Sequence, residues 1–260
     1  MGFARTDRDG IAVYTVSSFP AGALAVFSTR LGGVSRQPYA TLNVGAHVGD
    51  DPGAVAENRR RLATAVGLPE PWATVRQVHG SVVLRITAWP NGEPLGSADA
   101  LITDRPGLPL AIFTADCAAV YIYDPVRRAV GLAHAGWRGT ASAIAARTVA
   151  AMAEAYGTNP GDCYAAISPA IGSCCYEVDE AVVSRLRRFS WLGRVIRETR
   201  PGHWRLDLWS ANRLQLADAG LALERIAVSG LCTACHMDQF YSHRAEAGCT
   251  GRQVALLALK

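Results

Sequence analysis

Several features that would place this chain of 260 residues in other classes of protein are missing from it. No apolar run approaches the roughly 18 residues that a membrane span requires. Residues 1–9 are charged and lack the apolar centre of a secretory signal. The seven cysteines form an odd set with irregular spacing, which argues against a disulfide framework. We therefore expect a cytoplasmic protein with free or metal-bound thiols and no membrane partner.

Lysine is almost absent, and arginine supplies nearly all of the positive charge. Lys260 is the one lysine among 26 basic residues, and the net charge of +4 is mild. The arginine run at residues 59–61 has Asp50, Asp51 and Glu57 nearby, which is typical of a solvated helix face. The sequence holds no basic block that would mark a nucleic-acid arm, so we expect no nucleic-acid partner.

Common catalytic signatures are missing as well. The sequence has no G-x-G-x-x-G after a strand and no phosphate-binding P-loop. It also has neither the G-x-S-x-G elbow of hydrolases nor the H-x-E…P-C-x-x-C signature of zinc deaminases. Any chemistry must therefore come from another arrangement of side chains.

The pattern that is present alternates short β-prone runs with longer helical ones. Pro52–Val66 follows an acidic residue and reads as a helix, and residues 140–156 predict a second helix that Gly157 ends. Residues 178–189 read as a third helix. Short apolar runs at Leu110–Thr114, 118–123 and 129–133 read as strands, the last ending at His134. With no repeats or linkers, and with several connections too short for helical crossovers, residues 1–260 predict one continuous α/β domain with mixed sheets.

Three polar islands interrupt these apolar runs. They place His79 before a glycine, Cys117 between two strands, and His134 at the end of a strand. Ligands bind α/β sheets outside strand ends. One thiolate and two imidazoles form a three-ligand zinc set with an open fourth position, the pattern of catalytic zinc. The alternative for each residue taken alone is an ordinary core or surface side chain.

The island around His134 also holds small residues and two large ones. Ala135 and Gly136 would let the backbone and a ligand approach the imidazole closely. Trp137 reads as a packing anchor, whereas Arg138 fits either a structural or a functional role.

A fourth island contains Cys232, Cys235 and His236, and matches the C-x-x-C-H pattern of haem attachment. Covalent haem would require an export signal, so the alternatives are a second metal site or a loop bordering the pocket. The adjacent Cys174 and Cys175 are poorly placed to form a relaxed disulfide with each other, and we interpret them as structural residues.

Taken together, eight ordered segments resemble the family of YfiH- and YlmD-like purine nucleoside phosphorylases, formerly described as multicopper polyphenol oxidases or laccases. The matching segments cover nearly the whole chain: residues 28–35, 38–43, 47–51, 77–80, 114–117, 134–140, 169–172 with 175–178, and Cys232-Thr233 with Phe240, Ser242, Arg244 and 250–252.

The resemblance implies a single catalytic domain over residues 1–260, folded as a layered α/β sandwich with mixed β-sheets, and a role for each of the matching residues. His79, Cys117 and His134 would be the metal and catalytic residues, with zinc as the cofactor and copper as an alternative metal. Arg30, Asn43 and Arg244 would contact the substrate. We add Asp116 as a proton carrier or as a group that orients the neighbouring ligand.

The function implied is zinc-dependent phosphorolysis of adenosine, inosine, guanosine and methylthioadenosine, with adenosine deamination as a side activity. The partners would be a nucleoside and phosphate, and we expect a monomer. Three alternatives stay open. Copper-dependent phenol oxidation would need more histidines than the six present. A metal-free hydrolase would use Cys117 as nucleophile and His134 as base. A binding module would use no chemistry at all.

Overall fold

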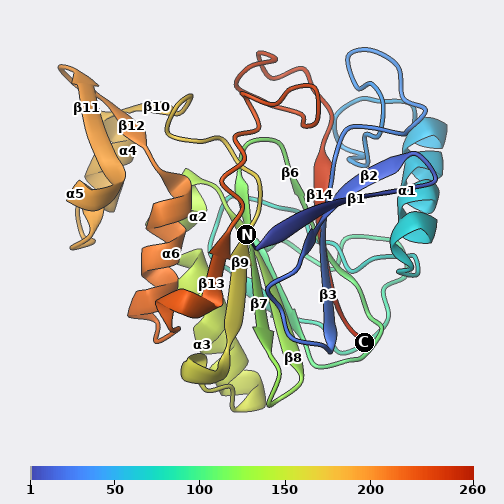
Figure 1. The fold of residues 1–260 in the computed structure, drawn as a ribbon, viewed down its shortest axis with the longest axis horizontal. Coiled ribbons are helices and arrows are strands. Elements are labelled where there is room, and N and C mark those ends of the chain that lie inside the picture. The colour runs from blue at the N-terminus through green and yellow to red at the C-terminus, as the bar shows by residue number, and fades with distance from the viewer. Residues whose placement is uncertain (1) are drawn as a thin grey trace.

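The computed structural model describes residues 2–260, and three β-sheets organise the fold (Figure 1). The first is a five-stranded antiparallel sheet. Its strands run in the order β1 (Phe3–Arg8), β2 (Ile11–Val16), β3 (Ala23–Ser28), β14 (Gln253–Leu259) and β6 (Leu110–Thr114). Segments from both ends of the chain therefore pair in one sheet.

The second sheet has six strands and carries the candidate site at one end. Its order is β13 (Ile226–Val228), β9 (Tyr164–Ile167), β7 (Ala118–Asp124), β8 (Ala129–Ala135), β5 (Ala100–Thr103) and β4 (Val83–Arg85). Its two outermost pairs are parallel and the rest are antiparallel. A small antiparallel sheet joins β10 (Glu177–Asp179), β12 (His203–Leu206) and β11 (Ile196–Arg200). The predicted mixed pairing thus occurs in the six-stranded sheet, and the other two sheets are antiparallel.

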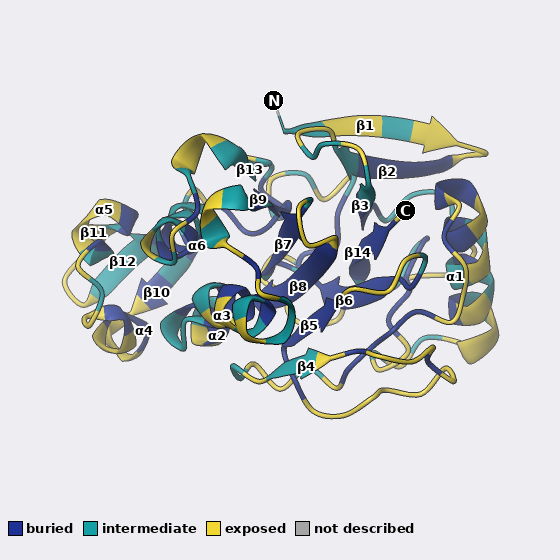
Figure 2. Cartoon of the chain, turned by 90° about the horizontal axis from the view of Figure 1, so that it is seen from below, coloured by how far each residue is buried: buried dark blue, intermediate teal, exposed yellow. Residues whose placement is uncertain are grey.

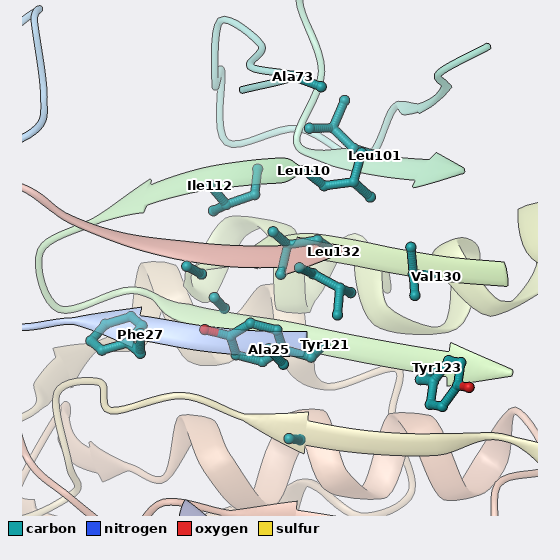
Figure 3. Close-up of a cluster of buried hydrophobic side chains, with 14 of the residues drawn as sticks. Ala25, Phe27, Ala73, Leu101, Leu110, Ile112, Tyr121, Tyr123, Val130 and Leu132 are labelled. Atoms are coloured by element: carbon teal, nitrogen blue, oxygen red, sulfur yellow. The ribbon is translucent and has the colours of Figure 1, made fainter. Parts of the chain in front are cut away.

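The two large sheets pack face to face over a shared apolar core (Figure 3). Leu110 and Ile112 of β6 meet Tyr121 of β7 and Leu132 of β8 in this layer, and all four are fully buried. The strands β6, β7 and β8 are buried along their whole length, because each has protein on both faces. This arrangement confirms the predicted layered α/β sandwich.

Helices cover the outer faces of the sandwich (Figure 2). α1 (Pro52–Val66) packs on the five-stranded sheet, and it has the predicted bounds because Asp51 caps its first turn and Gly67 ends it in the left-handed region. α3 (Ile144–Tyr156) and α6 (Leu208–Asp218) cover the six-stranded sheet. α4 (Glu180–Leu186) and α5 (Leu192–Val195) pack with the small sheet. Within residues 2–260, no helix combines the length and the apolar character that crossing a membrane would take.

Some of the predicted elements were wrong in their bounds. The predicted helix at 140–156 is two helices, α2 (Trp137–Ala141) and α3, because Ala143 takes a positive φ of 59° between them. The predicted helix at 178–189 is strand β10 followed by α4. His134 does not end its strand, since β8 continues to Ala135. Strand β1 was not predicted, because its charged side chains lie on an exposed edge.

Candidate metal centre and active site

The structure brings His79, Cys117 and His134 together at one end of the six-stranded sheet. Their ligand atoms all lie within 4.8 Å of one another. The sheet register explains two of the three positions. Ala118 of β7 pairs with Ala135 of β8, so Cys117 and His134 lie at the same end of adjacent strands. His79 comes from the loop before β4, and its ring meets that of His134 edge to face at 4.8 Å between centroids.

Asp99 holds both histidines in place, and the sequence analysis missed it. Its fully buried carboxylate accepts the Nδ1 proton of His134 at 2.9 Å, which leaves Nε2 to face a ligand. The same carboxylate accepts the backbone N–H groups of Val78, His79 and Gly80 at 2.6–3.1 Å. A carboxylate that orients a histidine in this way is the usual support of a metal ligand. The available signal was an acidic residue directly before the buried run of β5.

The same contacts set the charge states of Cys117, His134 and Asp99 when no metal is bound. Burial opposes ionisation of Cys117, but the imidazoles of His134 and His79 lower the pKa of its thiol to about 6. Burial opposes protonation of His134, but Cys117 and Asp99 raise its pKa to about 9. Burial alone would raise the pKa of Asp99, and hydrogen bonds from His134 and backbone N–H groups outweigh it and lower the pKa. Cys117 is therefore prepared as a thiolate, the form that binds metals.

The donor set fits a thiophilic cation of borderline softness. One thiolate and two imidazoles are ligands that both zinc and copper accept. His134 is oriented for this by Asp99, and the half-exposed Cys117 and exposed His79 leave an approach from solvent. His79, Cys117 and His134 would thus hold the ion with one position left for a substrate or water.

Gly136 allows the Cys117 sulfur to approach the backbone. A Cβ atom at Gly136 would lie 2.6 Å from Cys117 Sγ and 3.8 Å from the ring of His79. The backbone φ of Gly136 is −67°, which any residue adopts. The glycine is therefore required by the space that Cys117 occupies, whereas the predicted close approach of a ligand to His134 stays a prediction.

We expect Gly136→Ala to lower zinc affinity by about tenfold or more, because the added methyl must displace a ligand atom. Competition against a chromogenic chelator measures this change. Gly193→Ala is the matched control, since a Cβ there meets nothing within 4 Å. Equal zinc affinities for the two variants would contradict the assigned role of Gly136.

Asp116 organises the loops beside the metal ligands. Its φ is 83°, and its carboxylate accepts Thr233 Oγ1 at 2.6 Å and the backbone N–H of Arg244 at 2.7 Å. Its own carbonyl accepts the N–H of Ile171 at 2.8 Å. Asp116 thus joins the turn that carries Cys117 to two loops that approach it from elsewhere in the sequence.

The three predicted substrate contacts occupy different surroundings. Arg244 is exposed beside the site, where its guanidinium lies over the ring of Tyr176 and donates to the carbonyl of Glu177 at 3.1 Å. Asn43 is fully buried. Its side-chain NH2 group donates to the carbonyl of Gly45 and to the carboxylate of Asp50, and its Oδ1 accepts the N–H of Gly45 and, at 2.8 Å, the N–H of Arg252. Asn43 therefore lies within the protein, and its role as a substrate contact stays a prediction.

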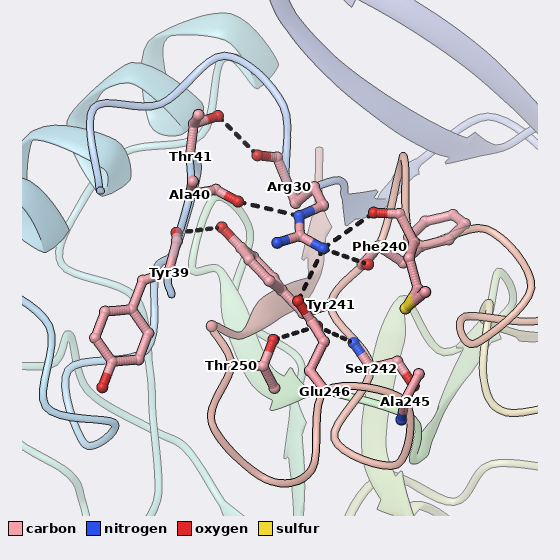
Figure 4. A network of polar contacts seen from close by, with 12 residues as sticks. Arg30, Tyr39, Ala40, Thr41, Phe240, Tyr241, Ser242, Ala245, Glu246 and Thr250 are labelled. Carbon is pink, nitrogen blue, oxygen red and sulfur yellow. Dashed lines mark hydrogen bonds and ion pairs between the residues drawn. The ribbon is translucent and has the colours of Figure 1, made fainter. Parts of the chain in front are cut away.

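Arg30 is already engaged by the chain itself (Figure 4). Its guanidinium donates to the carbonyls of Ala40 and Met237, pairs with Glu246 at 3.1 Å, and lies over the ring of Tyr241. It lines an open cleft of about 500 Å³ whose lining does not include His79, Cys117 or His134. Its role in substrate binding stays a prediction.

Arg252 and His47 were not singled out as site residues from the sequence. The guanidinium of Arg252 interacts electrostatically with Cys117 and Asp116. Burial, then Arg252 and Arg59, lowers the pKa of His47, whose ring meets Phe113 edge to face. The pairing of Gln253 in β14 with Thr114 in β6 brings Arg252 toward Cys117, and this pairing could not be predicted from local sequence.

Residues 24–260 match the family described as "Multi-copper polyphenol oxidoreductase laccase". The chain is 44% identical over 252 residues to "Purine nucleoside phosphorylase YlmD" of Geobacillus stearothermophilus, covering 91% of this chain and 90% of the relative. It is 36% identical over 242 residues to "Purine nucleoside phosphorylase YfiH" of Escherichia coli, covering 92% and 95%. The crystal structure of YlmD from Geobacillus stearothermophilus superposes with a TM-score of 0.91 at 42% identity, covering 100% of this chain and 99% of that one. The chain therefore belongs to this laccase-like family, together with the YlmD and YfiH proteins.

Proposed function

We propose that this protein is a zinc-dependent purine nucleoside phosphorylase. The observation that carries the proposal is the convergence of His79, Cys117 and His134 beside the exposed Arg244. The relatives' names support the reaction class, since both YlmD and YfiH are named purine nucleoside phosphorylases. Its substrates would be a nucleoside and phosphate, and the enzyme would be a cytoplasmic monomer.

In this reaction a phosphate oxygen bonds to C1′ of the sugar as the bond from C1′ to the purine nitrogen breaks. The purine leaves with the bonding electron pair and takes up a proton, and ribose 1-phosphate remains. Bound zinc would supply positive charge that orients the phosphate, or lower the pKa of a bound water.

Two arginines of the chain fit the phosphate. A guanidinium pairs with phosphate oxygens through two parallel N–H donors. Arg244 offers such a group at the surface, while Arg252 adds positive charge near Cys117. Asp116 fixes the backbone of Arg244, so we assign Asp116 a positioning role in place of proton transfer.

We expect adenosine, inosine, guanosine and methylthioadenosine as candidate substrates. Adenosine deamination is a second activity of the same centre in this proposal, because an activated water there would attack C6 of the purine and the 6-amino group would leave as ammonia. Release of inosine from adenosine without phosphate would be its signature.

The test of the proposal is product formation from inosine with copper excluded. Protein loaded with zinc should release hypoxanthine and ribose 1-phosphate steadily when phosphate is present, and the rate should depend on phosphate concentration. Hypoxanthine release at a rate that does not depend on phosphate, or no release of hypoxanthine, would overturn the proposal.

Copper-dependent phenol oxidation is the second candidate, because the matching family is described as a laccase. A multicopper oxidase needs a trinuclear copper cluster bound by many histidines. Within residues 2–260, the one metal-ligand group that contains histidine has two of them. Several coppers per chain with intense blue absorption would favour this candidate over phosphorolysis.

A metal-free Cys–His hydrolase is the third candidate, and the lowered pKa of the Cys117 thiol favours it. Metal analysis separates it from the main proposal. Loss of one equivalent of zinc in Cys117→Ala would support Cys117 as a metal ligand, whereas full activity in metal-free protein would support Cys117 as a nucleophile.

We expect Arg244→Ala to raise the KM for phosphate about 10- to 100-fold, because a hydrogen bond to a charged group contributes about 1.5–3 kcal/mol. Arg244→Lys should recover part of this loss, since it keeps the charge without the two parallel donors. Steady-state kinetics with varied phosphate measures both. Arg185→Ala, an exposed arginine on α4, is the control. An unchanged KM in Arg244→Ala would remove Arg244 from the phosphate site.

A further inference from the structure

Four cysteines gather at a second place in the fold. The sulfurs of Cys174, Cys175, Cys232 and Cys235 all lie within 4.8 Å of one another. They come from two loops, one between β9 and β10 and one after β13. His236, which the sequence grouped with Cys232 and Cys235, is not a member of this cluster, so its donor set is sulfur alone.

Cys232 and Cys235 form a compact C-x-x-C turn in which the first sulfur accepts backbone hydrogen bonds. Cys232 Sγ is buried and accepts the N–H of Gly172 at 3.2 Å. The backbone N–H of Cys235 is a second hydrogen-bond donor to this sulfur. Backbone N–H groups directed at a sulfur stabilise a thiolate, which is the form that ligates a metal.

Spacing between the sulfurs suits one shared ion. Cys235 Sγ lies 3.5 Å from Cys174 Sγ and 3.4 Å from Cys175 Sγ. A tetrahedral zinc with bonds of about 2.3 Å places its sulfurs about 3.8 Å apart. A disulfide would require one sulfur pair at about 2.0 Å, and here Cys235 favours neither neighbour.

We propose that Cys174, Cys175, Cys232 and Cys235 form a second metal site, a closed tetrathiolate site for zinc. Four thiolates leave no open position, which is the pattern of a structural site. The site is distinct from His79, Cys117 and His134, and the proposal does not depend on the reaction catalysed there.

The site would clamp the two loops that border the active centre. Beyond the cysteines, the loops are joined by the backbone bonds from Ala170 N to Leu231 O at 3.2 Å and from Thr233 N to Ala170 O at 3.0 Å. Thr233, next to Cys232, holds Asp116, and Ile171 donates to the carbonyl of Asp116. A metal joining these loops therefore stabilises the turn that carries Cys117.

The test is zinc stoichiometry in purified protein by mass-spectrometric metal analysis. We expect about two zinc ions per chain in the unaltered protein, one in Cys117→Ala, one in Cys235→Ser and none in the double variant. Cys249→Ser, an exposed cysteine outside both groups, should keep the unaltered content. If Cys235→Ser does not fold, Cys174→Ser, also exposed, replaces it.

Cobalt substitution in Cys117→Ala supplies an independent reading, because that variant keeps the four-cysteine group alone. Visible absorption typical of tetrahedral sulfur-bound cobalt supports the site. Equal zinc content in Cys117→Ala and in the double variant overturns it. A mass 2 Da lower per disulfide under non-reducing conditions also overturns it, in favour of a sulfur–sulfur bond. Both readings hold whether or not the protein cleaves nucleosides.

Discussion

Replacement of Cys117 by alanine should lower phosphate-dependent cleavage of inosine by more than about 100-fold. Loss of a group that merely orients a metal ligand costs about 10- to 100-fold in metal affinity or activity, so loss of the ligand itself should cost more. Two imidazoles remain in Cys117→Ala, and they lack the thiolate charge that offsets the cation. Zinc content and initial rates, measured on the same sample, test the expectation.

Cys249→Ala is the matched control for this variant, because Cys249 is exposed and lies outside both groups of metal-ligand side chains. Its zinc content and rate should equal those of the unaltered protein. If Cys117→Ala kept the zinc content of the unaltered protein, or kept its rate of inosine cleavage, the reaction would have to take place elsewhere.

Asp99→Asn should weaken both the metal centre and the fold. One carboxylate serves His134 Nδ1 and three backbone N–H groups, and an amide oxygen replaces just one of its two acceptors. We expect zinc affinity to fall about 10- to 100-fold. Each buried donor left without an acceptor costs about 1–3 kcal/mol, so the thermal midpoint should fall by several degrees.

Asp104→Asn is the control for Asp99→Asn, since Asp104 is an exposed acid whose ion pair with Arg85 spans 3.8 Å. A surface change of this kind usually alters stability by less than about 0.5 kcal/mol. Chelator competition and thermal unfolding, each with and without zinc, measure the two effects. If Asp99→Asn matched Asp104→Asn in both, the two histidines would not depend on Asp99.

The α/β class with mixed sheets could be predicted from the sequence because its strongest signals are local, and the layered sandwich followed from the family resemblance. Pro52–Val66 carries its own capping residues, and strands such as β6 and β14 are continuous apolar runs. Elements without a distinct apolar pattern of their own were not predicted. The break at Ala143 separates α2 from α3 within a uniform alanine-rich segment, and β1 has mostly exposed side chains and pairs with its sequence neighbour β2.

The candidate site shows the same division. Cys117 and His134 could be proposed because each lies where an apolar strand gives way to polar residues. Asp99 acts through a hydrogen bond that spans 35 positions of the sequence, and its one local signal, an acidic residue directly before the buried run of β5, does not identify His134 as its partner. Cys174 and Cys235 look like separate motifs until the loops that carry them meet.

Zinc titration of metal-free protein, with ribose 1-phosphate measured from inosine and phosphate at each step, tests the proposed function most directly. Product formation should rise with zinc bound at His79, Cys117 and His134, and Cys117→Ala should show no such rise. Ribose 1-phosphate formation at full rate in protein without zinc, or none at saturating zinc, would contradict the proposed function.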